Sequence, residues 1–366
     1  MFCRFWSFDC PWGTQVSGIA GIINLDSKPV DQQLLRRMTG FMAYRGPDAQ
    51  EVWVDGNVGF GHTMLRTTQE SHDEKQPCSL DGKVWITADA RIDDRPGLIQ
   101  KLEAGQPGDL RSATDVELIL HAYHEWGEDC IKHLLGDFAF AIWDGRTQRL
   151  FCARDHFGVK LFYYTYSGSC FVFSNTLNCL RLHPAVSDEL NEQTIADFLL
   201  FYYNPNLATT AFTNIERLPP GHHLTCSQEA LRIERYWSLP TDGHIIRYKR
   251  AGDYIDHFRE LLSKAVGDRL RTDRVAVWMS GGLDSTTLAA TACEPRDKRS
   301  VDIRAYCMVY DRLVPDGERY YSGLVAKSLG IPIQYLVADN YTLFDRWDDP
   351  ELHRPEPVEE PLLATY

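Results

Sequence analysis

The sequence lacks any apolar run of about 18 residues, so no membrane-spanning helix is expected. It also lacks a CxxC pair and any His/Cys cluster with the spacing of a zinc site. Ten cysteines in 366 residues are too few for a disulfide scaffold, and we expect buried, reduced thiols. Basic residues number 38 against 51 acidic ones, and the resulting net charge of −13 argues against nucleic acid as a partner.

The N-terminus carries no convincing targeting signal. Residues 1–15 make a poor signal peptide because Ser7, Asp9 and Pro11 interrupt their apolar residues. We therefore expect a cytoplasmic protein that binds no membrane. Its content of 44% hydrophobic and 24% charged residues is typical of folded globular domains, and the length suggests two to three of them.

Strand-like patterns dominate residues 17–180. The apolar run at 18–25 predicts a buried strand, and apolar residues at helical spacing predict helices at 31–43 and 114–126. Further strands are predicted at 51–54, 58–62, 83–88, 138–143, 149–153, 161–165 and 170–174. This pattern indicates an α+β domain. Residues 181–250 contain scattered prolines, and we expect a connecting region there, with a helix followed by irregular chain.

The pattern of predicted elements changes in residues 251–366, where helices and strands alternate. Helices are predicted at 254–270, 283–293 and 318–329, and strands at 274–279, 303–310 and 333–337. Apolar residues on both faces of the strands favour a parallel sheet covered by helices, which is an α/β architecture.

The sharpest motif is Ser280-Gly281-Gly282-Leu283-Asp284-Ser285, between an apolar strand and a helix. Glycines tolerate positive φ and carry no Cβ, so main-chain N–H groups can face an anion, and the helix directs its positive end there. Asp284 would repel phosphate unless it held a cation, which makes it the expected Mg²⁺ ligand. No Lys follows the glycines, so this is not a Walker loop. A tight turn that merely needs glycine is the structural alternative.

This motif resembles the pyrophosphate-binding loop of the ATP-pyrophosphatases, as in the asparagine synthetase family. Such enzymes cleave ATP to AMP and pyrophosphate and activate a carboxylate as an acyl-adenylate. The resemblance implies that ATP and Mg²⁺ are the cofactors and that Ser280, Gly281, Gly282 and Ser285 contact the phosphates. It also places Met279 and Met308 near the adenine, although their spacing alone favours a role in the core.

A second set of motifs supports the same family. Residues 18–22 resemble the strand that opens class II glutamine amidotransferase domains, and residues 45–48 resemble their RGPD segment. Further matches lie at 61–62, 114–117, 135–141, 153–158 and 163–164. The resemblance covers roughly residues 17–366. It implies an αββα sandwich of the Ntn-hydrolase type, followed by a doubly wound, Rossmann-like α/β ATP-pyrophosphatase domain.

Several site positions depart from the family pattern. The family's nucleophile is an N-terminal cysteine, whereas this sequence has Ser17, a weaker nucleophile. Met64 replaces the Arg that binds the glutamine carboxylate, and Arg66 follows two positions later. Asp89 stands where an oxyanion hole needs hydrogen-bond donors. Asp115, which would hold the glutamine amine, is retained. We therefore expect that glutamine hydrolysis is lost.

Such departures resemble those of the lasso-peptide cyclases and β-lactam synthetases, which keep the ATP site beside a degenerate amidotransferase domain. The first hypothesis is macrocyclisation of a precursor peptide, in which an internal amine attacks the acyl-adenylate at high effective molarity. A leader-peptide-binding protein and a protease are its implied partners. The second hypothesis is asparagine synthesis from aspartate, ATP and ammonia or glutamine. The third is an inactive fragment that binds only ATP or peptide.

The synthetase part, residues 251–366, is much shorter than in family members. Glu359-Glu360-Pro361 resembles the acidic-Pro segment that precedes the remaining half in the family, so we expect a fragment, a truncated gene or a split chain. That half would contain the rest of the acyl-substrate pocket and a catalytic Lys. Glu318 matches an acidic position of the family, and a solvated helix face explains it equally well.

Overall fold

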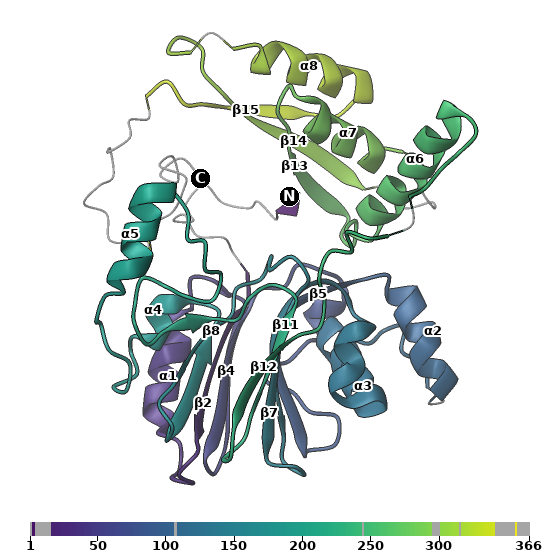
Figure 1. The fold of residues 1–366 in the computed structure, drawn as a ribbon. Coiled ribbons are helices and arrows are strands. Elements are labelled where there is room, and N and C mark those ends of the chain that lie inside the picture. The colour runs from purple at the N-terminus through teal and green to yellow at the C-terminus, as the bar shows by residue number, and fades with distance from the viewer. Residues whose placement is uncertain are drawn as a thin grey trace.

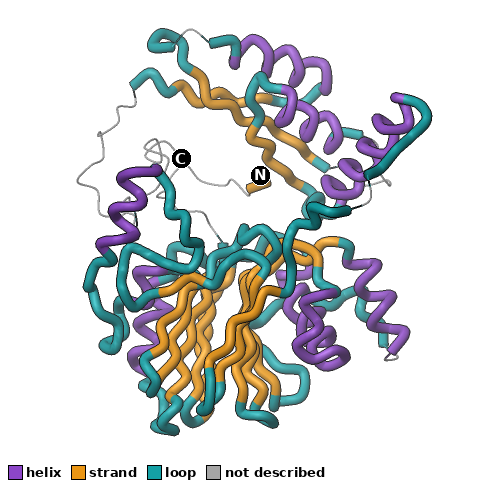
Figure 2. The backbone as a smooth tube through the Cα atoms, viewed as in Figure 1, coloured by secondary structure: helices purple, strands orange, loops and turns teal. Residues whose placement is uncertain are grey.

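The structure, a computed structural model, describes residues 2–3, 16–105, 108–243, 245–294, 301–314, 316–340 and 356. Figure 1 shows a sandwich of two sheets between helices and, beyond one end of its strands, a smaller α/β unit. We call residues 16–237 the sandwich and residues 251–340 the α/β unit. Figure 2 shows that strands fill the middle of the sandwich while helices lie outside them.

The first sheet of the sandwich has six antiparallel strands in the order β10-β8-β9-β2-β4-β3. These strands are β2 (Gly18–Asn24), β3 (Ala49–Asp55), β4 (Val58–Met64), β8 (Tyr163–Tyr166), β9 (Cys170–Ser174) and β10 (Glu216–Arg217). Helices α1 (Gln32–Phe41) and α4 (Leu177–Leu180) cover its outer face, where Leu35, Met38 and Leu177 are buried. Asp31 begins α1 because its carboxylate accepts from two N–H groups of the first turn.

The second sheet has five antiparallel strands in the order β12-β11-β7-β6-β5. These are β5 (Val84–Asp93), β6 (Leu135–Asp144), β7 (Arg149–Arg154), β11 (His222–Cys226) and β12 (Leu231–Arg235). Helices α2 (Arg95–Gly105) and α3 (Asp115–Trp126) pack on its outer face, and the 3₁₀ turns η1 (Glu70–His72) and η2 (Gly127–Lys132) lie in the connections. Between the sheets, Ile19, Phe60 and Phe173 pack against Ala141, Cys152 and Leu224. The predicted αββα sandwich is confirmed.

The start of α3 places a carboxylate at the end of the sandwich. Thr114 and Glu117 form a capping box, in which each side chain accepts from the other residue's main-chain N–H group. Asp115 is therefore held in the first turn of α3, and its side chain is only 8% exposed.

The predicted connecting region contributes more to the sandwich than expected. Helix α5 (Glu192–Phe201) agrees with the predicted helix, but β10, β11 and β12 follow where irregular chain was predicted. Strand β11 pairs with β7 over His223–Cys226, so this region completes the second sheet. Strand β12 is an edge strand with four exposed residues, and its polar sequence gave no buried-strand pattern.

The α/β unit contains three parallel strands, β13 (Arg274–Trp278), β14 (Asp302–Val309) and β15 (Ile333–Val337). Helices α6 (Ala251–Gly267), α7 (Leu283–Ala292) and α8 (Glu318–Leu329) form one layer over the sheet, as Figure 1 shows. Strand β1 (Phe2–Cys3) adds an antiparallel edge next to β13. The parallel α/β arrangement is confirmed. Its core contains Val275, Val277, Ala289 and Ala305.

One expectation for the α/β unit is corrected. The strands were predicted to bury both faces, but burial alternates along β13 and β14, so that Val277 is buried whereas Arg274 and Arg304 are exposed. Within the described residues, one face of this sheet is therefore packed and the other is more open. Of the helices in the described part, none is long and apolar enough to cross a membrane.

Candidate functional site

The glycine-rich loop connects β13 to α7 at the carboxyl end of the parallel strands. Its turn is held internally, because Ser280 N–H donates to Ser285 Oγ at 3.0 Å and Gly282 N–H donates to Ser280 Oγ at 3.2 Å. The two hydroxyl groups lie 2.9 Å apart. Leu283 is 84% exposed at the start of α7. The loop thus presents its amides and hydroxyls at an exposed helix N-terminus, a geometry that suits an anion.

Glu318, at the start of α8, completes this loop. Its Oε2 accepts from Gly281 N–H at 2.5 Å, so the carboxylate stands where a phosphate oxygen could accept the same hydrogen bond. A Cβ added at Gly281 would lie 2.9 Å from Tyr321 Cβ, which explains why this position requires glycine. Between the two explanations offered for Glu318, the structure favours a role in the loop over a solvated helix face.

The predicted metal and adenine positions differ in exposure. Asp284 is exposed in the first turn of α7, and its carboxylate oxygens are the hard ligands that Mg²⁺ prefers. Met279 is fully buried in the core of the α/β unit, whereas Met308 is half-buried on β14. Adenine contact by these two residues stays a prediction. Glu359, Glu360 and Pro361 lie outside the described residues.

Ser17 lies at the entrance to the sandwich, between β4 and Asn175. Its Oγ accepts from Leu65 N–H at 3.1 Å, and its carbonyl oxygen accepts from Asn175 Nδ2 at 2.8 Å. The same amide nitrogen lies 3.4 Å from Asp89 Oδ2, and Lys160 Nζ donates to Asp89 Oδ1 at 2.7 Å. The negative charge of Asp89 is therefore neutralised by an ion pair, which the sequence did not indicate.

Lys160 is directed at Asp89 by the loop between β7 and β8. The buried carboxylate of Asp155 accepts from the N–H groups of Phe157, Val159 and Lys160 at distances from 2.9 to 3.1 Å. Three such bonds fix the loop backbone. The sandwich backbone therefore holds the Asp89–Lys160 ion pair in place, and the two side chains are 7% and 17% exposed.

The residues in place of the expected carboxylate-binding Arg do not form an open cationic site. Met64 is 2% exposed at the end of β4. Arg66 donates from Nε to the Ser71 carbonyl at 3.0 Å and from Nη1 to the Asp48 carbonyl at 3.2 Å. Its guanidinium thus binds main-chain oxygens of neighbouring loops.

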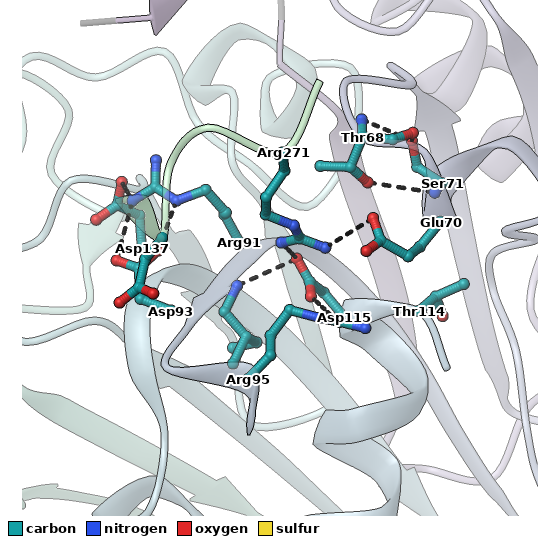
Figure 3. A network of polar contacts seen from close by, with 12 residues as sticks. Thr68, Glu70, Ser71, Arg91, Asp93, Arg95, Thr114, Asp115, Asp137 and Arg271 are labelled. Atoms are coloured by element: carbon teal, nitrogen blue, oxygen red, sulfur yellow. Dashed lines mark hydrogen bonds and ion pairs between the residues drawn. The ribbon is translucent and has the colours of Figure 1, made fainter. Parts of the chain in front are cut away.

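Asp115 is surrounded by donors, as Figure 3 shows. Ile92 N–H donates to its Oδ2 at 3.1 Å, Arg271 Nη1 donates to the same oxygen at 2.6 Å, and Arg95 Nη1 donates to Oδ1. Arg271 also donates to Glu70 Oε2 at 3.2 Å. The carboxylate that the family resemblance assigns to the glutamine amine therefore holds two guanidinium groups from this chain.

A second ionic cluster lies beside the first (Figure 3). Arg91 Nη2 lies 2.7 Å from Asp137 Oδ2 and its Nε lies 3.1 Å from Asp93 Oδ1. Arg269, from the α/β unit, contacts the same two carboxylates at 3.3 and 3.1 Å. Burial raises the pKa of both carboxyl groups in spite of the neighbouring charge of Arg91. This cluster joins the α/β unit to the end of β5.

Family models decide the relationship of the chain to known proteins. Residues 16–237 match the model described as a glutamine amidotransferase domain, and residues 257–364 match the model described as asparagine synthase. The chain belongs to the asparagine synthetase family.

Individual curated proteins align with most of the chain. The glutamine-hydrolyzing asparagine synthetase 3 of Bacillus subtilis (strain 168) is 31% identical over 309 residues, which cover 83% of this chain and 49% of that protein. Amidase chry2 of Gibberella zeae is 28% identical over 366 residues, which cover 92% of this chain and 51% of that protein. The chain thus spans about half the length of the curated relatives it matches.

Among solved structures, the B. subtilis glutamine phosphoribosylpyrophosphate amidotransferase complexed with ADP and GMP aligns with a TM-score of 0.43 and 15% identity. The alignment covers 87% of this chain and 65% of that chain.

Several residues of the site were not found from the sequence. Arg95 and Arg271 pair with Asp115, and Lys160 pairs with Asp89, but these partners are 20, 156 and 71 residues away along the chain. No local pattern links such pairs. One signal was available, namely that two positions matched to the family's glutamine site, Asp89 and Asp115, are carboxylates, because buried carboxylates require cations.

Glu74, whose carboxyl is affected by the charges of Asp115 and Arg271, leads to a prediction about how stability depends on pH. Burial raises the pKa of its carboxyl from 4.5 to about 7, although Gln76 Nε2 donates to its Oε1 at 2.7 Å. The stability contributed by the bound proton is complete below pH 4.5 and is lost as the pH rises through 7. Glu74→Gln keeps an acceptor without the charge, so we expect it to stabilise the protein by about 3 kcal/mol at pH 8 and by less than about 1 kcal/mol at pH 5.

Urea unfolding at both pH values measures this difference. Glu229→Gln, on an exposed turn, is the matched control and should change neither value. Equal stability of Glu74→Gln and the parent protein at pH 8 would contradict the prediction.

Proposed function

We propose that this protein is an ATP-dependent ligase that forms a carbon–nitrogen bond through an acyl-adenylate and does not hydrolyse glutamine. The observation that carries the proposal is the contrast between the two sites. The glycine-rich loop holds its N–H groups in an exposed turn, where their partners are the hydroxyls of Ser280 and Ser285 and the carboxylate of Glu318. The carboxylate of Asp115, in contrast, is buried and holds two guanidinium groups.

The chemistry of the proposed reaction has two steps. An oxygen of the substrate carboxylate attacks the α-phosphorus of ATP, and pyrophosphate leaves with the electrons of the broken P–O bond. An amine then attacks the acyl carbon, and AMP leaves. Ser280, Gly281, Gly282 and Ser285 would hold the departing pyrophosphate through N–H and O–H donors, and Asp284 would hold Mg²⁺, which offsets the phosphate charge when bound. Met279 and Met308 would lie on the adenine side.

Loss of glutaminase activity is supported by the residues of the degenerate site. Ser17 offers a hydroxyl whose oxygen already accepts a main-chain N–H, and Met64 offers no charge for a substrate carboxylate. A soluble amino acid could reach the carboxylate of Asp115 only by displacing Arg95 or Arg271. The amine must then come from free ammonia or from the substrate itself.

For the substrate class, we propose macrocyclisation of a precursor peptide, in the manner of a lasso-peptide cyclase, because an internal amine makes an ammonia supply unnecessary. A leader-peptide-binding protein, a protease and a cytoplasmic location stay predictions. Asparagine synthesis is the second candidate, and the names of the B. subtilis relatives favour it.

Titration calorimetry with ATP and MgCl₂ tests the nucleotide site, with Ser280→Ala/Ser285→Ala as the variant. We expect the parent chain to bind and the variant to bind at least about tenfold more weakly, because two phosphate donors are removed. Absence of binding to the parent chain would overturn the proposal. ATP–pyrophosphate exchange then distinguishes the substrates: stimulation by a precursor peptide supports macrocyclisation, and stimulation by aspartate alone supports asparagine synthesis.

Glutamine hydrolysis provides the separate test of the degenerate site. We expect no glutamate release from glutamine, and none after Ser17→Cys, because restoring a thiol does not free Asp115 or supply a carboxylate-binding cation. Ordinary glutamine turnover by the parent chain contradicts this part of the proposal and leaves the ligase part intact.

Glu318→Ala is expected to raise the affinity for ATP measured without Mg²⁺ by about 3–10-fold. The change frees Gly281 N–H for a phosphate oxygen and removes a negative charge beside the phosphate chain. Asp302→Ala makes the same charge change at the opposite end of β14 and serves as the control. Weaker ATP binding by Glu318→Ala under these conditions would show that Glu318 assists the nucleotide instead of competing with it.

A further inference from the structure

We propose that the Asp115 carboxylate is now an internal cation site, filled by the guanidinium of Arg271, which docks the α/β unit on the sandwich. The inference rests on the proposed function in one respect, because it takes Asp115 as the position that would hold a substrate amine in a working glutaminase. What the pocket binds in this protein is then another part of the same chain.

The contacts around Asp115 show how completely the site is used. Its two oxygens accept from Ile92 N–H, from Arg95 and from Arg271. The side chain of Asp115 is 8% exposed, and those of Arg95 and Arg271 are each 11% exposed. Breaking an ion pair that is this well buried is strongly unfavourable unless another cation takes the vacated place.

Arg271 comes from outside the sandwich. It follows α6 and precedes β13, and its guanidinium joins two carboxylates of the sandwich, Asp115 on α3 and Glu70 on η1. Arg95, by contrast, belongs to the sandwich itself and begins α2. Arg271 therefore connects the two parts at Asp115, and Arg95 supports the carboxylate that receives it.

Charge complementarity extends along the same interface. Arg269 contacts Asp93, Lys264 Nζ lies 3.4 Å from Asp94 Oδ1, and Asp94 N–H donates to Asp268 Oδ2 at 3.3 Å. Burial tends to lower the pKa of Arg271, but the negative charges of Asp115 and Glu70 outweigh burial and raise it. Lys264, Arg269 and Arg271 thus present cations to an acidic edge formed by Asp93, Asp94 and Asp115.

The position of Arg271 connects this contact to the nucleotide site. Strand β13 begins at Arg274 and ends at Trp278, directly before the glycine-rich loop. The contact of Arg271 with the sandwich therefore fixes the beginning of β13, and the proposed phosphate site follows the other end of the same strand. The former amine pocket would serve to place that strand, which explains why Asp115 is retained although the other glutamine-binding positions have changed.

Hydrogen–deuterium exchange of the full chain without nucleotide tests the proposal. In Arg271→Ala, we expect the amides of residues 90–95 and 268–274 to exchange at least about tenfold faster than in the parent protein. Low-millimolar guanidinium chloride should restore protection by refilling the vacated site, whereas an equal concentration of sodium chloride should not. Arg304→Ala, which removes an exposed Arg from the same unit, is the control and should leave both segments unchanged.

Glu70→Gln is the milder variant if Arg271→Ala does not fold. It removes one of the two carboxylates that hold the guanidinium and keeps Asp115, so we expect a smaller acceleration of exchange in the same two segments. Unchanged exchange in both variants, or restoration by sodium chloride as effective as that by guanidinium, would overturn the proposal. Because no nucleotide is present, these results are independent of whether the chain binds ATP.

Discussion

Asp115→Asn is expected to lower the free energy of unfolding by about 3–5 kcal/mol, the usual cost of removing one partner from a buried ion pair. Two guanidinium groups, Arg95 and Arg271, would then face a neutral amide in a site from which water is largely excluded. The change also removes a negative charge from the first turn of α3, worth about 0.3–1 kcal/mol. Urea unfolding at pH 7 measures the loss.

Asp109→Asn is the matched control for this prediction. Asp109 pairs with Arg111, but their side chains are 61% and 82% exposed, so solvent screens the pair and it contributes little to stability. Because Asp109→Asn is the same chemical change six residues away, the comparison separates the effect of burial on stability from the effect of losing a negative charge. A loss of stability in Asp115→Asn no larger than in Asp109→Asn would show that the buried network contributes little.

Gly281→Ala is expected to weaken ATP binding by about 100-fold or more, which corresponds to about 2.7 kcal/mol. The new Cβ would lie 2.9 Å from Tyr321 Cβ, which is rigidly attached to α8, so the loop must move away from that helix. This displacement moves Gly281 N–H and changes the direction in which the turn presents its donors to a phosphate group. Titration calorimetry with ATP and MgCl₂ measures the effect.

The stability of the protein should change much less than its nucleotide affinity, since the loop is exposed and its shift uncovers little core. Gly252→Ala is the control, because a Cβ there meets no atom within 4 Å and alanine favours α6 by about 1 kcal/mol. Wild-type ATP affinity in Gly281→Ala would contradict the assignment of this loop to phosphate.

Local patterns predicted most elements near the proposed ATP site. The helix expected at 318–329 is α8, and the strand expected at 274–279 is β13 less one residue. Both have strong apolar patterns and clear boundaries. Strands β11 and β12 were missed because they are short and polar, and β12 is an edge strand that buries little. Helix α2 was missed because Pro96 and Gly97 in its first turn usually interrupt helices, although proline is tolerated there.

Local motifs were sufficient to recognise the family and the glycine-rich loop, because both depend on residues that are neighbours in the chain, and the family resemblance implied the αββα sandwich. Comparison with the family pattern also pointed to positions that differ from its glutamine site. The present partners of those positions became visible in the folded molecule alone. Asp89 meets Lys160, and Asp115 meets Arg271 from the other unit. Buried charges require partners of opposite sign. Because the fold brings these partners together from distant parts of the chain, no regular spacing in the sequence reveals them.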